Sequence, residues 1–378
     1  MADSNIQIPF FDASASYHLQ KEEIDRAIQN VLDKGAFING REVELFSYSL
    51  ASYLGVNHVV PCANGTDALS LALMALELDK EDEIIIPAFN FIAAAEAVAL
   101  LGLVPVFVDI CENDFNIDSS LIEGKLTSKT RAIMVTHLFG ASAQMDEIKT
   151  VAEKHNLYII EDAAQSLGSE YRNQKLGTLG HIGCTSFFPT KNLSCFGDGG
   201  AVFTNDAILA GKIKMIANHG QIKKYEHEII GVNSRLDTLQ AAILNVKLHK
   251  LNEAIEARRN IANLYHEHLK DVEKVQLPFE SPKTVHSFNQ YCILLENKLV
   301  RDALKEYLKN AGISTMIYYP KPTHLQKAFS ICGGTEGDFP LSENACERIL
   351  ALPIFPTLDI QQQHYIINQL KTFISDAN

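Results

Sequence analysis

Short apolar runs alternate with helical patterns between about residue 57 and residue 205, and this alternation limits the folds that the chain can adopt. Six runs rich in β-branched or apolar residues predict strands, at 83–86, 104–110, 132–136, 157–160, 184–188 and 201–204. The segments 67–78, 91–101 and 145–155 between them have helical spacing. Nearly continuous apolar strands that alternate with helices predict an α/β fold, with a mostly parallel sheet covered on both faces.

Helical patterns also lie on both sides of this region. Residues 21–34 carry apolar side chains at helical spacing and are followed by Gly35, a residue type that commonly ends helices. Residues 236–270 have a long helical pattern without proline or glycine, which suits a helix that connects two lobes or packs across a dimer. One strand-like run and two helical patterns follow, at 289–295, 301–310 and 359–375.

These patterns predict two domains. We expect a large domain over residues 1–250 and a smaller α+β domain over residues 251–378, because 378 residues allow one large core plus a second unit. The helix over residues 21–34 is assigned to the large domain by its position in the chain, although it could pack on the small one.

The composition excludes several classes of partner. Apolar residues make up 47% of the chain and charged residues 21%, as in ordinary globular enzymes, and the net charge of −13 argues against a broad nucleic-acid surface. No apolar stretch suits a membrane span, and no secretory signal is visible. Seven scattered cysteines without a C-x-x-C pair favour a reducing cytoplasm and offer no metal site. We therefore expect a cytoplasmic protein without metal, membrane or nucleic-acid partners.

One lysine stands between a strand-like run and a glycine-rich loop. Lys191 follows the run Phe187-Phe188-Pro189-Thr190 and precedes Gly197-Asp198-Gly199-Gly200. An isolated lysine after a proline turn would be a solvated surface residue. Here the flanking residues predict a partly enclosed site. An enclosed lysine with a lowered pKa can form an imine with an aldehyde.

A carboxylate lies 29 residues before this lysine. Asp162 ends the strand-like run, and as an isolated residue it would serve as the N-cap of the next segment. Its alternative role is to keep a pyridinium nitrogen protonated. Such a carboxylate and a reactive lysine are the two protein groups that pyridoxal phosphate requires. If Glu161 faces the opposite side of the strand, only Asp162 can reach the ring.

Other residues could hold a phosphate and a ring. Gly65 and Thr66 stand at the predicted start of a helix, where backbone N–H groups favour phosphate, although capped helices commonly begin this way. Ser186 is a second candidate phosphate donor. Phe91 could stack on a pyridine ring or be an ordinary core residue.

An amide and a guanidinium precede the long helical pattern. Asn233 could donate to phosphate, and Arg235 could bind a carboxylate or phosphate through two parallel hydrogen bonds. The alternative is an exposed capping segment with a solvated arginine.

Taken together, five motifs in this order resemble the DegT/DnrJ/EryC1/StrS family of sugar-nucleotide aminotransferases. The likeness runs from Gly35 to Pro356. The motifs are Asn64-Gly65-Thr66, Glu161-Asp162-Ala163-Ala164-Gln165-Ser166, Ser186-Phe187-Phe188-Pro189-Thr190-Lys191-Asn192, Gly197-Asp198-Gly199-Gly200 and Asn233-Ser234-Arg235-Leu236-Asp237.

The resemblance implies the type I fold of pyridoxal-phosphate-dependent transferases, like that of aspartate aminotransferase, and a homodimer with active sites at its interface. It implies that Lys191 forms the imine and shuttles the proton, that Asp162 pairs with the ring nitrogen, and that Gln165 contacts the phenolic oxygen. The implied phosphate contacts are Gly65, Thr66, Ser186 and, from the other subunit, Asn233, and the implied stacking residue is Phe91. The implied substrate contacts are Gly35, Phe37, Thr190, Arg235, Tyr318 and Tyr319.

The resemblance also implies a reaction. Within the family, the chain is most similar to enzymes that aminate UDP-2-acetamido-2-deoxy-3-oxo-glucuronate with glutamate as donor, for surface polysaccharides such as the lipopolysaccharide O-antigen. Arg235 is then the natural partner of the hexuronate carboxylate. Tyr318 departs from the family pattern, in which a histidine often precedes Tyr-Pro, and this changes the donors beside the sugar. Two alternatives stay open: amination at C4 or C3 of a dTDP-, GDP- or UDP-linked keto-6-deoxy sugar, and a regulatory member of the family.

Overall fold

The computed structural model describes residues 6–376 and is built around one seven-stranded sheet. The strands follow the order β1-β9-β8-β5-β4-β2-β3, and only β9 runs antiparallel to its neighbours. The mostly parallel sheet predicted from the sequence is therefore confirmed. In spatial order the strands are β1 (His58–Cys62), β9 (Gly200–Thr204), β8 (Ile182–Ser186), β5 (Tyr158–Asp162), β4 (Thr130–Thr136), β2 (Glu83–Pro87) and β3 (Val104–Val108).

Helices cover both faces of this sheet, because successive strand residues point to opposite sides. On β4, Met134 packs with helices α4, α5 and α8, whereas Ile133 and Val135 pack on the other side with α7. Nearer β1 and β9, this second side is covered by α3 and α9. The helices are α3 (Arg41–Leu54), α4 (Gly65–Ala75), α5 (Ala93–Leu100), α7 (Met145–His155), α8 (Ala207–Ala217) and α9 (Thr238–Leu248).

The C-terminal part has a core of its own, built around buried residues such as Tyr265, Tyr291 and Leu350. The start of the chain joins it: Ile8 donates a backbone hydrogen bond to Gly312 and accepts one from Ser314. The two-domain division stays a prediction, and residues 6–11 belong structurally with the C-terminal part. Its elements are α10 (Leu251–Leu269), β13 (Tyr291–Leu294), α11 (Lys298–Asn310), α12 (Pro340–Arg348), β14 (Ile349–Leu352) and α13 (Ile360–Asp376).

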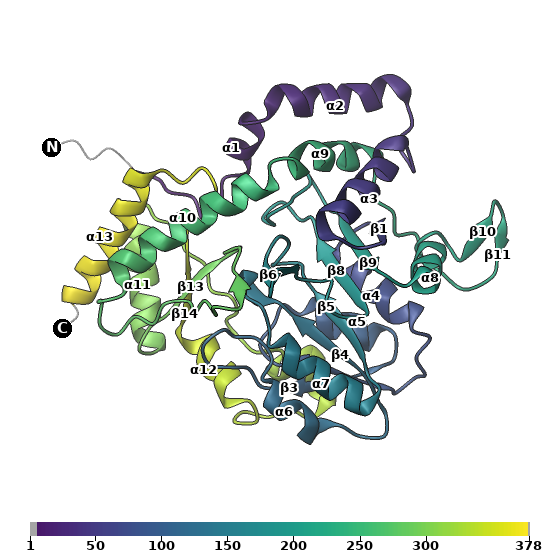
Figure 1. The fold of residues 1–378 in the computed structure, drawn as a ribbon. Helices are drawn as coiled ribbons and strands as arrows, with labels where there is room; N and C mark the ends of the chain where they lie inside the picture. Colours follow the sequence, from purple (N-terminus) through teal and green to yellow (C-terminus); the bar gives the residue numbers. More distant parts are fainter. Residues whose placement is uncertain (1–5, 377–378) are drawn as a thin grey trace.

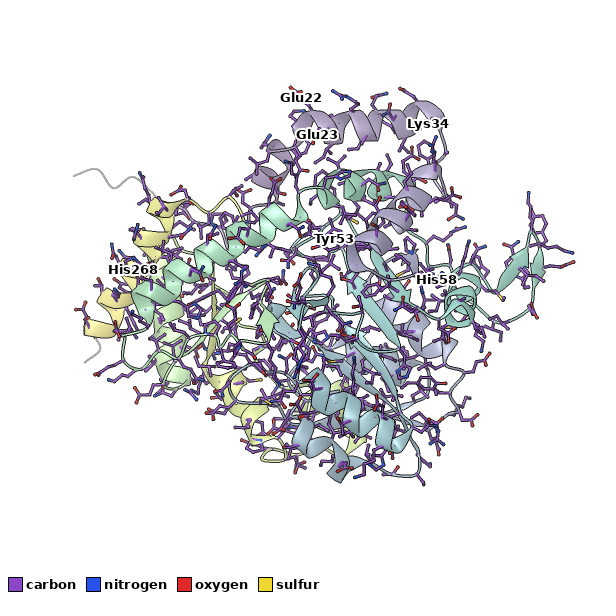
Figure 2. All side chains as sticks on the ribbon, viewed as in Figure 1. Glu22, Glu23, Lys34, Tyr53, His58 and His268 are labelled. Atoms are coloured by element: carbon purple, nitrogen blue, oxygen red, sulfur yellow. The ribbon has the colours of Figure 1, made fainter. Side chains whose placement is uncertain are left out.

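Helix α2 (Lys21–Lys34) packs along α9 at the top of the view in Figure 1. Its acidic first turn (Glu22, Glu23) and its last residue, Lys34, complement the helix dipole (Figure 2). The helix ends as predicted at Gly35, which adopts a left-handed φ of 68°.

The helical pattern over residues 236–270 forms two helices rather than one. Helix α9 ends at Leu248 and α10 begins at Leu251. Between them, Lys250 leaves helical geometry with φ −106° and ψ 4°, and its N–H bonds to the carbonyl of Lys247. Local apolar spacing continues across this break, so the sequence pattern alone did not reveal it.

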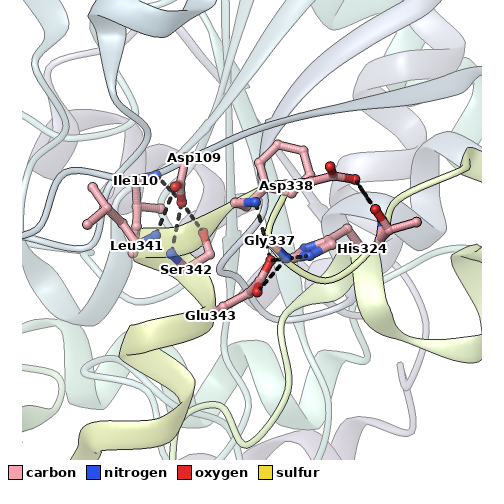
Figure 3. A network of polar contacts seen from close by, with 10 residues as sticks. Asp109, Ile110, His324, Gly337, Asp338, Leu341, Ser342 and Glu343 are labelled. Carbon is pink, nitrogen blue, oxygen red and sulfur yellow. Dashed lines mark hydrogen bonds and ion pairs between the residues drawn. The ribbon is translucent and has the colours of Figure 1, made fainter.

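A network of polar contacts ties α12 to the end of the central sheet (Figure 3). The Asp109 carboxylate follows β3 and accepts hydrogen bonds from the backbone N–H groups of Leu341 and Ser342, at 3.0 and 2.8 Å. In the first turn of α12, Glu343 accepts from the N–H of Gly337 in the preceding loop and contacts His324 Nε2 at 3.1 Å. These bonds hold the start of α12 at the end of β3 and join it to the loop before it.

The remaining elements are short. Strands β10 and β11 form a hairpin that projects from the body of the molecule (Figure 1). Among residues 6–376, no helix combines the length and the apolar character that crossing a bilayer would require. The short remaining elements are α1 (Ala13–His18), α6 (Ser119–Ile122), β6 (Glu170–Tyr171), β7 (Gln174–Lys175), β10 (Gln221–Lys223), β11 (Glu226–His227), β12 (Thr284–Val285) and four 3₁₀ turns at Glu123–Lys125, Leu138–Gly140, Thr323–Leu325 and Lys327–Cys332.

Candidate active site

Several predicted residues gather where the parallel strands end. Asp162 is the last residue of β5, Ser186 is the last residue of β8, and β8 pairs with β5 in parallel register. Gly65 opens α4 beside them. Lys191 lies five residues beyond the end of β8. This edge of the sheet is where α/β folds bind their ligands.

The start of α4 offers a place for a phosphate. The Asn64 side chain accepts the Asp67 N–H at 2.8 Å and caps the helix, so the N–H groups of Gly65 and Thr66 have no partner within the helix. A methyl group at Gly65 would lie 2.7 Å from Cβ and 3.2 Å from Oγ of Ser186. The lack of a side chain at Gly65 therefore lets the Ser186 hydroxyl stand directly at the helix N-terminus.

The Lys191 amine is buried and has a lowered pKa. It makes no hydrogen bond or ion pair within the described residues 6–376. Burial lowers its pKa from 10.5 to about 8, and the charge of Asp162 opposes this shift only in part. A pKa of about 8 leaves an appreciable neutral fraction near neutral pH, which attack on an aldehyde requires.

Asp162 is the carboxylate that faces this amine. It is 8% exposed and accepts the Ala164 N–H at 3.0 Å, so it also serves the capping role considered as its alternative. Burial raises the pKa of its carboxyl, and the Ala164 N–H and Lys191 oppose the rise. The charges of Lys191 and Asp162 affect each other without a direct ion pair. This separation suits two groups that contact opposite ends of one bound ring.

Glu161 is held on the other face of β5. Its carboxylate accepts the backbone N–H groups of Gly177 and Leu179, at 2.8 and 2.6 Å, and that of Gly180. His137 Nε2 lies 2.8 Å from it, and because His137 Nδ1 accepts the Ala143 N–H, Nε2 carries the proton. Glu161 is thus a buried structural anchor, and Asp162 alone is left to address the site.

Gln165 and Tyr319 are coupled. Gln165 Oε1 accepts the Phe139 N–H at 2.9 Å, and its Nε2 donates to the Tyr319 hydroxyl at 3.0 Å. The Tyr319 ring lies 6.1 Å from that of Phe91, whose side chain is 54% exposed and therefore open to a stacking partner. The ring centres of Tyr318 and Tyr319 are 5.7 Å apart.

The other predicted residues form a second group at the start of α9. The carbonyl of Phe37, two residues after Gly35, accepts the Thr238 N–H at 2.9 Å. Asn233 forms an isolated antiparallel β-bridge with Asn218. Arg235 is half-buried and makes no hydrogen bond or ion pair among residues 6–376. Within the part of the chain that the structure describes, no hydrogen bond or ion pair joins this group to Lys191 or Asp162. Thr190, by contrast, stays near Lys191, and its carbonyl accepts from Asn289 at 3.3 Å.

Two cations near Lys191 were missed by the sequence analysis. Lys247 is buried on α9, where it donates to Ser194, and Arg258 is buried on α10. The one signal for Lys247 was its place among the apolar residues Ile243, Leu244, Val246 and Leu248. No comparable pattern surrounds Arg258.

The residues present fit pyridoxal phosphate. The cradle between Gly65 and Ser186 suits the phosphate, Asp162 suits the ring nitrogen, and Lys191 suits the aldehyde carbon. Gln165 and the exposed Phe91 lie at the same edge of the sheet.

Comparisons with known proteins agree with this site. Residues 18–371 match the DegT/DnrJ/EryC1/StrS aminotransferase family. The chain is 42% identical to the pleiotropic regulatory protein of Geobacillus stearothermophilus, over 97% of this chain and 99% of that protein. It is also 42% identical to the UDP-2-acetamido-2-deoxy-3-oxo-D-glucuronate aminotransferase of Pseudomonas aeruginosa, over 93% and 96%. Among solved structures, DesV of S. venezuelae in complex with a ketimine intermediate matches with a TM-score of 0.95 and 38% identity, over 97% and 98%.

The chain belongs to the DegT/DnrJ/EryC1/StrS aminotransferase family. The predicted family and fold class, the aminotransferase activity and the pyridoxal phosphate cofactor are therefore confirmed. The roles of the individual site residues remain predictions that the geometry makes specific.

Proposed function

We propose that this aminotransferase transfers an amino group from glutamate to carbon 3 of a UDP-linked 3-keto sugar, with UDP-2-acetamido-2-deoxy-3-oxo-glucuronate as the first candidate. The proposal is supported by the P. aeruginosa relative, which is similar over nearly the whole length of both chains. The observation that carries it is the pairing of a deprotonatable Lys191 with a buried Asp162 at one edge of the sheet.

Each residue of the site has a separate role in the proposed reaction. When bound, pyridoxal phosphate supplies an aldehyde carbon and an electron-withdrawing ring. The Gly65 and Thr66 N–H groups and the Ser186 hydroxyl would bind the phosphate, and Asp162 would hold a proton on the ring nitrogen. Lys191 Nζ, neutral in part near pH 8, would accept a proton from the amine-bearing carbon of the donor and, in the second half of the reaction, would deliver a proton to the sugar carbon that receives the amine.

Arg235 supports a uronate as the substrate. It is a half-buried guanidinium without a carboxylate partner among residues 6–376. Because a guanidinium matches a carboxylate through two parallel hydrogen bonds, an unpaired arginine beside a sugar site favours an acidic sugar. A diphosphate could bind the same guanidinium. An assay across several keto sugar nucleotides distinguishes a carboxylate contact from a diphosphate contact.

We further propose a homodimer in which Asn233 and Arg235 complete the partner's active site. Both residues follow the projecting β10–β11 hairpin, and in the described part of one chain neither bonds to Lys191 or Asp162. The hairpin and the segment after it expose apolar side chains, with Tyr225 82% and Ile230 91% exposed. Such apolar exposure on a projecting arm suits contact with a second subunit.

Mixed dimers test this arrangement. Lys191→Ala and Asn233→Ala homodimers should each be nearly inactive. If Asn233 acts across the interface, subunit exchange between them creates dimers with one intact site, and activity returns. If both residues serve the site of their own chain, every site in the mixture stays defective and no activity returns.

A coupled assay across keto sugar nucleotides tests the reaction. The holoenzyme, with glutamate, should convert the UDP-linked 3-keto uronate faster than 3- or 4-keto-6-deoxy sugars linked to dTDP, GDP or UDP. NMR of the product locates the new amine. Amination at C4, or a preference for a 6-deoxy sugar, would replace the proposed substrate with the alternative one.

A regulatory role is the second candidate, because one relative of 42% identity is named a pleiotropic regulatory protein. The two candidates differ in chemistry. A purified protein that shows no imine absorbance band with pyridoxal phosphate would favour the regulatory role, and a band that disappears in Lys191→Ala supports the enzyme.

For the enzyme we propose a cytoplasmic role in the biosynthesis of a surface polysaccharide such as the O-antigen. The seven cysteines, all free in the structure, suit that compartment.

A further inference from the structure

A cavity of about 370 Å³ adjoins Lys191. It lies between the N-terminal segment around α1, the loop after β8, and the junction of α9 with α10. Its walls combine apolar residues such as Phe11 and Leu251 with four cationic side chains: Lys191, Lys247, Lys250 and Arg258.

Lys247 is an unusual residue in this wall. Its side chain is 8% exposed, and its ammonium donates to Ser194 Oγ at 2.6 Å and lies 5.3 Å from the centre of the Phe196 ring. No carboxylate pairs with it among residues 6–376. Burial accordingly lowers the pKa of Lys247 from 10.5 to about 8. A buried ammonium of this kind gains stability when an anion binds beside it.

The neighbouring charges do not neutralise Lys247. Arg258 Nη1 donates to the carbonyls of Phe288, Asn289 and Ile354, at 2.9–3.3 Å, and these neutral groups leave its charge uncompensated. Two acidic residues, Asp12 and Glu253, also line the cavity, against the four cationic side chains. Glu253 pairs with Lys250 at 3.0 Å, and Asp12 accepts the Ala15 N–H. The cavity beside Lys191 therefore has an excess of positive charge.

We propose that this cavity binds a carboxylate of the amino donor, with Lys247 as the cation that receives it. The proposal rests on the proposed transamination, which requires an acidic amino acid to reach Lys191. A diphosphate fits this wall less well. Phosphates are bound by helix N-termini and arginine forks. In this wall Arg258 Nη1 already donates to three backbone carbonyls, and Glu253 places a negative charge in the first turn of α10. The buried cation left to receive an anion is the compact Lys247 ammonium beside the Ser194 hydroxyl. The start of α4, which combines a helix N-terminus with the Ser186 hydroxyl, is expected to hold the cofactor phosphate.

Binding of glutarate to the holoenzyme tests the proposal without turnover. Glutarate carries the two carboxylates of glutamate and no amine, so isothermal titration measures binding without transamination, and the variants below identify the contribution of the cavity. Lys247→Met should weaken glutarate binding by about tenfold or more, because it removes a charged hydrogen bond. Lys247→Arg keeps the charge and should retain most of the affinity.

Two further variants control the test. Lys250→Met removes a cation from the same wall that is exposed and already paired with Glu253, and it should change the affinity by less than about twofold. Ala254→Asp leaves Lys247 in place but adds a negative charge to the cavity wall. It should weaken glutarate binding as Lys247→Met does, and it serves if the methionine variant does not fold.

The outcomes separate the cavity from the reaction. Loss of glutarate affinity in Lys247→Met, with UDP affinity unchanged, supports the donor site. Loss of UDP affinity with glutarate unchanged overturns it in favour of a nucleotide site, and unchanged affinity for both overturns it altogether. The imine absorbance band, measured in the same samples, reports independently whether the proposed function itself holds.

Discussion

A methyl group placed on Gly65 would lie 2.7 Å from Cβ of Ser186, closer than non-bonded carbons normally approach. The first residue of α4 and the last residue of β8 are thus in contact because one of them has no side chain. This contact brings a helix N-terminus and a hydroxyl together at one point. It creates the candidate phosphate cradle, and it gives Gly65 a steric reason to be glycine.

Gly65→Ala should release the cofactor. The added methyl must displace Ser186, at a cost of about 1–3 kcal/mol, and the displacement spreads the phosphate ligands apart. We expect the dissociation constant for pyridoxal phosphate to rise by about tenfold or more, measured by absorbance during dialysis. Gly211→Ala is the matched control, because nothing lies within 4 Å of its added methyl and it sits within helix α8. Equal cofactor retention in both variants would contradict the cradle.

The pH dependence of imine formation should report the lowered pKa of Lys191. In the folded protein this pKa lies at about 8, so half of the amines are neutral at that pH rather than at 10.5. The rate at which the apoprotein forms an imine should therefore rise with pH and level off above about 8. In Asp162→Asn the carboxylate charge that raises the pKa is lost, so the midpoint should move to lower pH. A wild-type midpoint above pH 10 in stopped-flow absorbance would contradict the burial of this amine.

Part of this arrangement followed from the sequence, and the physical reason is local. Helices over residues 21–34 and 145–155 were predicted at their observed bounds, because apolar spacing and helix-ending residues act within a few positions. The break between α9 and α10 was not predicted, because it depends on packing against parts of the chain that are distant in sequence. The functional importance of Lys191 was predicted from its flanking motifs, but its pKa follows from burial that only the fold creates.

The same distinction applies to the coupled residues of the site. No spacing rule links Gln165 to Tyr319, which lie 154 positions apart, or Lys247 to Ser194, which lie 53 apart. These pairs meet only because the loop beyond β8 and the segment before α12 return to the sheet edge.

The adjacent carboxylates Glu161 and Asp162 should respond to mutation in opposite ways. Glu161→Gln replaces a buried acceptor of backbone N–H bonds with an amide that must turn donors toward them, and it should cost about 2–4 kcal/mol of unfolding free energy. Asp162→Asn should cost less than about 1 kcal/mol but lower turnover by about 10²–10³-fold, because the ring nitrogen loses its counter-charge. Denaturant unfolding and steady-state kinetics on both proteins measure the contrast. A stable, fully active Asp162→Asn enzyme would remove Asp162 from the mechanism.

Tyr319→Phe should disturb the cofactor ring through Gln165. The change leaves Gln165 Nε2 without its acceptor, at a cost of about 1–3 kcal/mol, and frees the side chain expected to contact the phenolic oxygen. The absorbance maximum of the bound cofactor should therefore shift. Tyr318→Phe is the control, because its hydroxyl makes no hydrogen bond within residues 6–376. An identical spectrum in both variants would show that Gln165 does not depend on Tyr319.

Arg235 should decide between an acidic and a neutral sugar. It is half-buried without an anionic partner among residues 6–376, so a bound carboxylate would receive a charged, two-pronged contact that no neutral sugar can use. Arg235→Met should raise KM for a 3-keto uronate by about ten- to hundredfold and change kcat little, because binding is lost equally in the ground state and the transition state. Arg235→Lys should recover only part of the loss, since an ammonium cannot form the paired bonds. For a 6-deoxy keto sugar with the same nucleotide, KM should change by less than about threefold. If KM rises equally for both sugars, the guanidinium contacts the diphosphate they share, and the preference for a uronate must be sought in other residues.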